Sequence, residues 1–184
     1  MHRKGQPLLL YNIRDGGSAL AAVSTEKKTC ATALASSSWA VAAAHGFEDG
    51  QLMPRDFMLA ITQRIAACVT VPVTADFEGG QAVSPLDIEG STAVLLATGI
   101  AGLNFEDQVV GGAGLYRIAA QVPRSCSTRG LFPGIGSDVY QRKDRPFLQQ
   151  VDNGQHAGLI EQIIARTRAY QNAGADGFCP GFEG

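Results

Sequence analysis

The sequence predicts a parallel α/β fold. Short apolar, β-branched runs alternate with segments of helical periodicity along the 184 residues, and this alternation is typical of parallel sheets. Acids and glycine-rich turns recur directly after the expected strands, where α/β barrels and open sheets keep their sites. About six strand–helix units are expected, whereas a full (β/α)₈ barrel typically takes ~250 residues. The sheet therefore either stays open or lacks its last two units.

The first two strands are expected in the N-terminal quarter. Leu8–Ile13 is a short apolar run, the turn Asp15–Ser18 supplies residues that cap helices, and Ala19–Ser24 is predicted to form a short helix. A second strand is expected at Ala31–Ala35, directly before Ser36, Ser37 and Ser38. An apolar run, 39–44, then leads into a loop at 45–50.

The clearest helix starts at Pro54, because proline suits the first helical position. Its apolar residues recur at helical spacing and form one stripe, Phe57, Ile61, Ile65 and Cys68. The strand Val71–Asp76 is expected next, since its β-branched residues suit a buried parallel strand. A helix at Pro85–Thr98 and a strand at Ala101–Phe105 complete the following unit.

The C-terminal part has a weaker pattern. Leu115–Val122 is predicted to be a short helix that ends at Pro123, because proline removes a helix hydrogen bond. Between 125 and 146 no helical periodicity survives. A wide apolar stripe then predicts a helix at Leu159–Ala173, and Ala175–Cys179 is expected to be one more strand.

Carboxylates follow two neighbouring strands of the predicted sheet. Asp76 and Glu78 share one face of the extended chain, because side chains alternate along a strand. Glu106 follows the next strand, about one strand–helix–strand unit (~30 residues) later. Converging carboxylates are costly unless they bind a cation or pair with a base. The pattern therefore predicts a divalent-metal site at the shared rim.

The bulk composition excludes some classes of function. The chain is 45% hydrophobic and 17% charged with a formal net charge of −2, so there is no electrostatic argument for nucleic acid or an anionic membrane. Its four cysteines are widely spaced, which indicates buried or free thiols in a reducing compartment and no disulfide framework or zinc site. The apolar run near the N-terminus is too short for a signal sequence, no run is long enough to span a membrane, and a cytoplasmic location is expected.

Six short motifs, each present once, are distributed along most of the chain: Asn12–Ala19 (NIRDGGSA), Ala35–Ala42 (ASSSWAVA), Gly46–Gly50 (GFEDG), Ala75–Gly80 (ADFEGG), Gly102–Gln108 (GLNFEDQ) and Ala173–Phe178 (AGADGF). In order and spacing they resemble the isocitrate lyase/phosphoenolpyruvate mutase superfamily, particularly its phosphoenolpyruvate-mutase-like (phosphonomutase) branch. The resemblance implies a (β/α)₈ TIM-barrel type of fold, with residues 1–184 forming a single, C-terminally truncated domain of about six of the eight units. It also implies a homo-oligomer and a Mg²⁺-dependent enzyme that makes or breaks a C–C or P–C bond next to a 2-oxo acid.

The resemblance also implies roles for individual residues. Asp76, Glu78 and Glu106 match the acids that hold Mg²⁺, often through water, and Ser37 and Ser38 match the loop that touches the carboxylate and oxo group of a small 2-oxo acid or phosphonate substrate. Asp49 matches an acid near the reacting centre, and Asp15 matches an acid of the first loop. Two alternatives stay open: the serines also fit a helix cap, and Asp49 also fits an ordinary loop acid.

The chain departs from the superfamily pattern in several places. The Lys-Lys-Cys-Gly-His loop of its lyases is absent after Asp107, and Gly136 stands where a substrate-binding Arg is expected. The last two barrel units are also missing. These departures support an alternative function, a truncated and catalytically inactive homologue that acts only as a binding or structural remnant. A third possibility is an open flavodoxin-like sheet, in which Asp76 and Glu106 do not converge.

Overall fold

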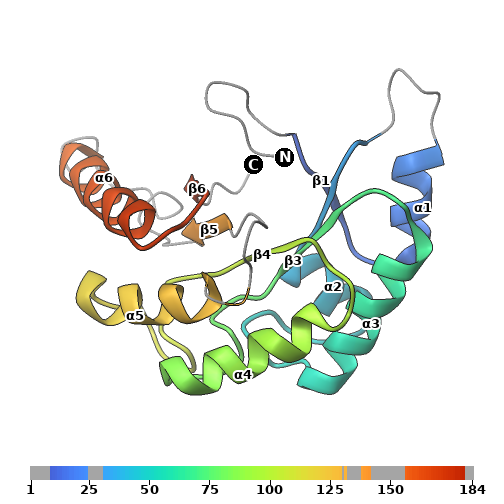
Figure 1. The fold of residues 1–184 in the computed structure, drawn as a ribbon, viewed down its shortest axis with the longest axis horizontal. Helices are drawn as coiled ribbons and strands as arrows, with labels where there is room; N and C mark the ends of the chain where they lie inside the picture. Colours follow the sequence, from blue (N-terminus) through green and yellow to red (C-terminus); the bar gives the residue numbers. More distant parts are fainter. Residues whose placement is uncertain (1–8, 25–30, 130, 132–137, 142–155, 181–184) are drawn as a thin grey trace.

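The computed structural model of the chain describes residues 9–24, 31–129, 131, 138–141 and 156–180. These described residues form a six-stranded parallel sheet at the centre, in which each strand pairs with the next strand along the chain (Figure 1). The strands are β1 (Tyr11–Ile13), β2 (Leu34–Ser36), β3 (Val73–Asp76), β4 (Gly102–Asn104), β5 (Asp138–Gln141) and β6 (Gly177–Pro180). This order is the winding of a (β/α)₈ barrel, whereas a flavodoxin-like sheet has a different order. The structure therefore confirms the parallel α/β prediction and excludes the flavodoxin-like alternative.

The helices connect successive strands. They are α1 (Gly16–Ser24), α2 (Ser38–Ala44), α3 (Arg55–Cys68), α4 (Pro85–Leu96), α5 (Ile118–Arg129) and α6 (His156–Asn172). Figure 1 shows α1, α3, α4, α5 and α6 in an arc around the strands. Local sequence accounts for several of their ends: the Ser84 hydroxyl accepts a hydrogen bond from the Asp87 N–H at the start of α4, with proline in the first turn.

The hydrophobic core lies between the strands and these outer helices. One cluster joins β3 and β4 to α4, and its largest fully buried members are Phe77, Ile88, Leu95, Leu103 and Phe105. A second cluster joins the first three strands to α1 and α3 through Ile13, Ala19, Leu34, Ile65 and Val73. The first cluster fixes the ends of β3 and β4 relative to each other, which is where the predicted acids lie.

The prediction that a helix ends at Pro123 is wrong. Helix α5 runs from Ile118 to Arg129 with Pro123 inside it. A proline inside a helix typically costs ~3 kcal/mol, but the polar residues around it are buried and bonded. Gln121 donates to the backbone oxygen of Glu106 at 3.0 Å, and Arg124 is only 2% exposed. Tertiary contacts, which periodicity does not register, therefore keep this helix intact.

Two smaller differences concern α2 and α3. The apolar run at 39–44, expected only to lead into a loop, is part of the helix α2. In α3 the buried face differs from the predicted apolar stripe. Phe57, the first residue of that stripe, is 42% exposed, whereas the buried residues of the helix are Thr62 and Ile65. Phe57 instead packs edge-on against the His45 ring, with 5.2 Å between the ring centroids.

Some sequence predictions fall outside the described residues. Gly136, which replaces the expected Arg, lies there, and β5 is described only from Asp138 onward. Cys30 also lies outside, whereas Cys68 and Cys126 are free thiols as predicted.

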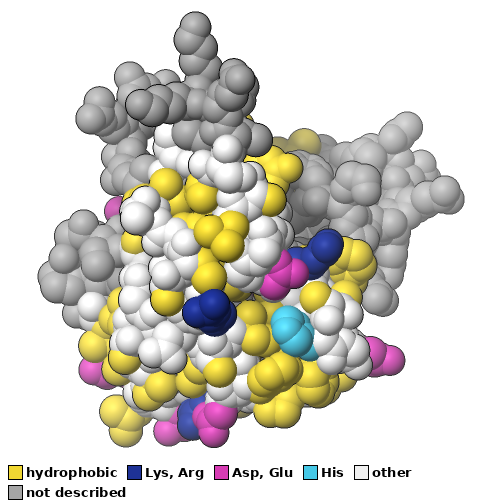
Figure 2. Space-filling view, turned by 90° about the vertical axis from the view of Figure 1, so that its right-hand side faces the viewer, with side chains coloured by type: hydrophobic (Ala, Val, Ile, Leu, Met, Phe, Trp, Pro, Cys, Tyr) yellow, Lys and Arg dark blue, Asp and Glu magenta, His cyan; other side chains and the backbone are white. Residues whose placement is uncertain are grey.

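The outer surface keeps exposed apolar side chains. Figure 2 shows hydrophobic side chains spread over the face that lies on the right of Figure 1, where α1 and α3 run. Among the exposed residues of α1, α2 and α3 are Leu20 (49% exposed), Trp39 (59%) and Phe57 (42%). Within the described part of the chain, no helix combines the length and apolarity needed to cross a membrane.

Candidate active site

The end of β3 is the centre of the candidate site. Asp76 is its last residue, and it pairs in register with Asn104 of β4. Backbone pairing continues beyond the strands. The Phe77 N–H donates to the backbone oxygen of Asn104 at 2.9 Å, and the Glu106 N–H donates to the backbone oxygen of Glu78 at 2.7 Å. The backbones of Glu78 and Glu106 therefore lie side by side, as the sequence pattern predicts.

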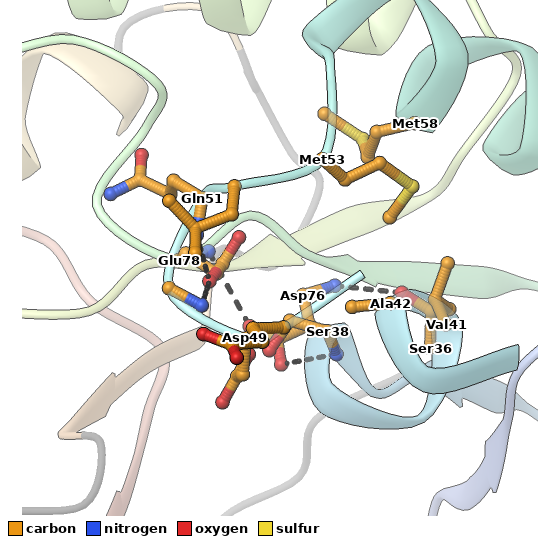
Figure 3. A pocket seen from close by; sticks show the side chains of 13 residues that line it. Ser36, Ser38, Val41, Ala42, Asp49, Gln51, Met53, Met58, Asp76 and Glu78 are labelled. Carbon is orange, nitrogen blue, oxygen red and sulfur yellow. Dashed lines mark hydrogen bonds between the residues drawn. The ribbon is translucent and has the colours of Figure 1, made fainter. Parts of the chain in front are cut away.

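Asp76 is held by the strand and helix that precede it in the barrel order. The Ser38 N–H, at the first residue of α2, donates to Asp76 Oδ2 at 2.9 Å, and the Asp76 N–H donates to Ser36 Oγ at 2.9 Å (Figure 3). The Glu78 N–H approaches Asp76 Oδ1 at 3.4 Å. These bonds orient the carboxylate and join the ends of β2 and β3.

Glu78 connects β3 to the loop that carries Asp49. Glu78 Oε1 accepts hydrogen bonds from the Gly50 N–H at 3.1 Å and the Gln51 N–H at 3.0 Å (Figure 3). The side chain is only 9% exposed. Because charge-assisted bonds to N–H groups are stronger than neutral ones, this contact fixes the Asp49 loop against the end of β3.

The same loops contain three non-glycine residues with positive φ: Gln51 (67°), Glu78 (49°) and Gln81 (56°). Residues other than glycine adopt this region at an energetic cost, and such strain clusters at functional sites. The three are bonded to one another, since the Gln51 N–H donates to Glu78 and Gln51 Oε1 accepts from the Gln81 N–H at 2.8 Å. Sequence reasoning missed Gln51 and Gln81, because nothing in their local sequence signals this backbone.

Gly79 and Gly80 allow these loops to approach closely. A Cβ on Gly79 would lie 2.6 Å from Val110 Cγ2, and a Cβ on Gly80 would lie 2.8 Å from the Phe105 ring. Gly80 also has a φ of 85°, which side chains rarely tolerate. The pair therefore serves close packing of the loop after β3.

A small cavity, partly open to solvent, lies between these loops. Asp49, Asp76 and Glu78 line it together with Ser36 and Ser38, and Figure 3 shows Asp49 and Asp76 beside Ser38. An adjoining cavity is lined by Glu78 and Glu106 with Gln108 and neighbouring glycines. Glu78 is thus shared between the two.

The predicted metal ligands are close in the fold but do not form one tight cluster. Asp76 and Glu78 line the first cavity, whereas Glu106, which is 4% exposed, lines the second. Among the described residues, no group of three or more His, Cys, Asp or Glu side chains could hold a metal ion. The donor set is nonetheless entirely carboxylate oxygen, which is the kind Mg²⁺ prefers while keeping several of its waters. A water-mediated Mg²⁺ site fits these residues.

The three serines have different positions. Ser36 and Ser38 line the first cavity, whereas Ser37 is the N-cap of α2 and its side chain accepts from the Ala40 N–H at 3.4 Å. Asp15 is also at a helix start: its Oδ1 accepts from the Ser18 N–H at 2.6 Å. This bond, with the nearby Arg14, lowers the pKa of Asp15. Ser37 and Asp15 therefore accept hydrogen bonds from backbone N–H groups at the starts of α2 and α1.

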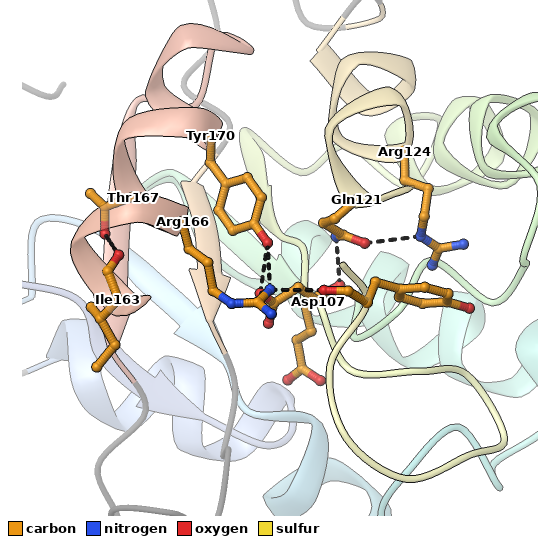
Figure 4. Close-up of polar contacts among 9 residues, drawn as sticks. Asp107, Gln121, Arg124, Ile163, Arg166, Thr167 and Tyr170 are labelled. Atoms are coloured by element: carbon orange, nitrogen blue, oxygen red, sulfur yellow. Dashed lines mark hydrogen bonds and ion pairs between the residues drawn. The ribbon is translucent and has the colours of Figure 1, made fainter. Parts of the chain in front are cut away.

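Asp107, directly after Glu106, is completely buried in a different environment. Its Oδ2 accepts from Arg166 Nη1 at 2.8 Å and from the Tyr170 hydroxyl at 2.7 Å (Figure 4). Burial and the adjacent Asp107 raise the pKa of Tyr170. This cluster of Asp107, Arg166 and Tyr170 attaches α6 to the loop after β4.

Arg124 of α5 anchors the loop after β3 from the outside. Its guanidinium donates to the backbone oxygens of Gly79, at 2.9 Å, Ala82 and Val83 and stacks 4.2 Å from the Tyr116 ring centroid. Burial lowers the pKa of Arg124. The loops after β3 and β4 are thus held by contacts from α5 and α6.

Comparison with known proteins identifies the family. The family model of phosphoenolpyruvate phosphomutase matches residues 1–183. The chain belongs to this family. An oxaloacetate decarboxylase from Ectopseudomonas mendocina (strain ymp) is 32% identical over 121 residues, which cover 63% of this chain and 38% of the decarboxylase. The matched stretch thus covers well under half of the length of that relative.

Solved structures of the superfamily share the fold. A protein from Burkholderia cenocepacia J2315, described as a candidate phosphonomutase, has a TM-score of 0.83 and 34% identity, over 98% of this chain and 72% of that one. Phosphonopyruvate hydrolase, solved in complex with oxalate and Mg²⁺, has a TM-score of 0.75 at 18% identity, over 92% of this chain and 57% of that one. The prediction of a TIM-barrel type of fold of the phosphoenolpyruvate mutase superfamily is confirmed, with six of its strands among the described residues.

Proposed function

We propose that this phosphoenolpyruvate phosphomutase family chain is a Mg²⁺-dependent enzyme that makes or breaks a C–C or P–C bond next to a 2-oxo acid. The observation that carries the proposal is the first cavity, where Asp49, Asp76 and Glu78 meet beside Ser38. Members of the family are mutases, lyases, hydrolases and decarboxylases, and a protein with the same fold binds oxalate and Mg²⁺. Oxalate has the shape and charge of the enolate of a 2-oxo acid.

In this proposal, Asp76, Glu78 and Glu106 hold Mg²⁺, partly through water. When bound, the ion acts as a Lewis acid that stabilises negative charge on the substrate oxo oxygen. Asp76 keeps its orientation through the N–H of Ser38 and the hydroxyl of Ser36. All proposed ligands are oxygen donors, in agreement with the preference of a hard cation.

The remaining residues bind substrate and transfer protons. Ser38 contacts the carboxylate and oxo group, and Ser37 supports this contact by capping α2. Asp49 donates or accepts a proton at the reacting centre, because its carboxylate lines the cavity beside Asp76. The bonds from Gly50 and Gln51 to Glu78 hold the Asp49 loop over the substrate.

One observation favours the alternative of a catalytically inactive homologue. In the described part of the chain, the acids do not form a group of three that could hold a metal. Such a protein would keep the fold and its bonded loops but would bind neither Mg²⁺ nor an enolate mimic.

A thermal melt with and without Mg²⁺ and oxalate separates the two functions. A ligand that binds only the folded state stabilises it by about 2.7 kcal/mol at a hundredfold excess over Kd. We expect an upward shift in Tm that is lost in Asp76→Ala and retained in Asp56→Ala, whose side chain is 92% exposed on α3. A cooperative melt without any shift would contradict the enzyme proposal and support the inactive homologue.

A further inference from the structure

Asn104, the last residue of β4, is a buried carboxamide beside the acids of the candidate site. It is 5% exposed and pairs in register with Asp76 of β3. Neighbouring strands of a sheet lie only about 4.8 Å apart. The backbone of Asn104 therefore lies directly beside the backbone of the acid at the centre of the site.

The side chain of Asn104 points to the same face of the sheet as the acids. Leu103 and Phe105, on either side of it, pack against α4 in the first hydrophobic cluster. Because side chains alternate along an extended chain, Asn104 points to the opposite face, toward the inside of the barrel. The same alternation applies on β3, where both neighbours of Asp76 belong to that cluster. Asn104 thus lies on the inner face, beside Asp76 and two residues before Glu106.

The carboxamide oxygen of Asn104 has no hydrogen-bond partner among the described residues. Oδ1 is fully buried, and none of these residues donates to it. A buried acceptor without a donor is unfavourable, because it has lost its hydrogen bonds to water.

A second buried carboxamide shows what a structural role looks like. Gln121 of α5 is completely buried and is bonded at both ends (Figure 4). Its amide donates to the backbone oxygen of Glu106 at 3.0 Å, and its oxygen accepts from Arg124 Nε at 3.0 Å. Asn104 differs from it, because its acceptor is left for a donor that the described residues do not supply.

The chemistry of the candidate site limits which ligand can be this donor. The oxygens of oxalate or of an ionised 2-oxo acid accept hydrogen bonds and do not donate them. Mg²⁺ usually keeps several of its waters in a protein site, and each bound water can donate. Such waters are strong donors, because the ion polarises them.

We propose that Asn104 is a further residue of the cation site, and that its Oδ1 accepts a hydrogen bond from a water bound to Mg²⁺. The carboxamide adds an acceptor beside Asp76 and Glu106 without adding negative charge. It positions the hydrated ion and does not touch the metal. This inference rests on the function proposed above and deepens it by assigning a residue that a search for acids does not find.

Thermal melts without Mg²⁺ test whether Asn104 has a structural bond. Asn104→Leu keeps the branched shape and removes the acceptor, and it is expected to melt at or above the wild-type Tm because no hydrogen bond is lost. Gln121→Met, the matched variant of the bonded carboxamide, is expected to melt several degrees lower. Asn104→Ala, which is too small to clash, repeats the test. If both Asn104 variants melt as low as Gln121→Met, Asn104 is held by a structural bond and the inference is wrong.

Calorimetric titration with Mg²⁺ alone tests the binding role. Asn104→Leu is expected to bind Mg²⁺ about tenfold more weakly than the wild type, as is typical when a contact around the direct ligands of a metal is removed. Asn104→Asp keeps an acceptor in the same place and is expected to bind Mg²⁺ at least as tightly as the wild type. Leu86→Ala, at a residue that is 76% exposed on α4, is the control and should bind as the wild type does.

The outcomes separate this inference from the proposed function. If the wild type binds Mg²⁺ and Asn104→Leu binds it equally well, an ordinary buried water satisfies Oδ1, so the inference is wrong and the proposed function stands. The inference is also wrong if Asn104→Asp binds Mg²⁺ as weakly as Asn104→Leu. If the wild type binds no Mg²⁺, the proposed function fails and the inference fails with it. A loss in Asn104→Leu that is absent in Asn104→Asp supports the inference.

Discussion

Acids follow both β3 and β4, but the two groups have different surroundings. After β3, Asp76 and Glu78 are bonded by backbone N–H groups from the loops after β2 and face a cavity. After β4, Asp107 is fully buried, and its carboxylate is paired with Arg166 and Tyr170 of α6. Asp76 and Glu78 thus face a cavity, whereas Asp107 attaches a helix to the barrel.

The difference shows that an acid after a strand is not by itself a sign of a binding site. The donors differ between the two places: backbone N–H groups bond to Asp76 and Glu78, whereas a guanidinium and a phenol hydroxyl bond to Asp107. The cost of removing both charges of a buried ion pair from water offsets most of the attraction between them. Removing one partner is nevertheless strongly destabilising, because the other charge is left buried without it.

The largest effect is expected for Asp107→Ala. This change leaves Arg166, whose side chain is 14% exposed, without its carboxylate, and breaking a buried pair in this way costs about 3–5 kcal/mol. Urea unfolding measures the loss. Asp56→Ala, which removes an acid from an exposed pair, should change the free energy of unfolding by about 1 kcal/mol or less. Equal losses in the two variants would show that Asp107 does not anchor α6.

Gly80→Ala tests the close packing after β3. The new Cβ meets the Phe105 ring at 2.8 Å, and the backbone φ is 85°, so a loss of about 1–3 kcal/mol is expected. Gly90→Ala is the matched control, since nothing lies within 4 Å of its Cβ in α4. There the gain in helix propensity is expected to stabilise the protein by about 0.5–1 kcal/mol. If both variants were destabilised, or both stabilised, close packing at Gly80 would not be the cause of the difference.

The sequence predicted the strands around the site well and some of the helices poorly. Val73–Asp76 lies within the expected strand 71–76, because β-branched residues signal a buried strand without tertiary information. The end of α5 was missed, because Gln121 and Arg124 stabilise the helix through distant backbone oxygens. The N–H groups that bind Glu78 also come from a loop that is distant in the chain.

The site was predictable as residue types but not as contacts. The pattern of acids after a strand made Asp76 and Glu78 candidate ligands, the family resemblance added Asp49, and the structure brings these three to one cavity. The strained backbone at Gln51 and Gln81 could not be predicted, because their φ values result from packing between loops that are 30 residues apart.

Tyr170→Phe is expected to have a smaller effect, which depends on pH. Losing the hydroxyl that donates to Asp107 should cost about 1 kcal/mol at neutral pH. Burial raises the pKa of Tyr170, so above about pH 10 the unfolded chain loses this proton first and the native state is destabilised as pH rises. Urea midpoints between pH 8 and 11 should therefore fall less steeply in the variant than in the wild type. Parallel curves would refute this assignment.

The smallest effect is expected at the N-cap of α2. Ser37→Ala removes the side-chain oxygen that accepts from Ala40 and should lower stability by about 0.5–1 kcal/mol, whereas Ser37→Asn should restore it because Asn caps equally well. The Tm shift with Mg²⁺ and oxalate should be smaller in Ser37→Ala and recover in Ser37→Asn. If Ser37→Asn recovers stability but not the ligand shift, Ser37 touches the ligand directly.

Binding of Mn²⁺, used as a paramagnetic substitute for Mg²⁺ and followed by electron paramagnetic resonance, tests the central claim most directly. We expect the wild-type protein and Asp56→Asn to bind the ion, and Asp76→Asn and Glu78→Gln to bind it at least tenfold more weakly while remaining folded. Equal Mn²⁺ binding by wild type and Asp76→Asn would contradict the claim that the acids after β3 form the cation site.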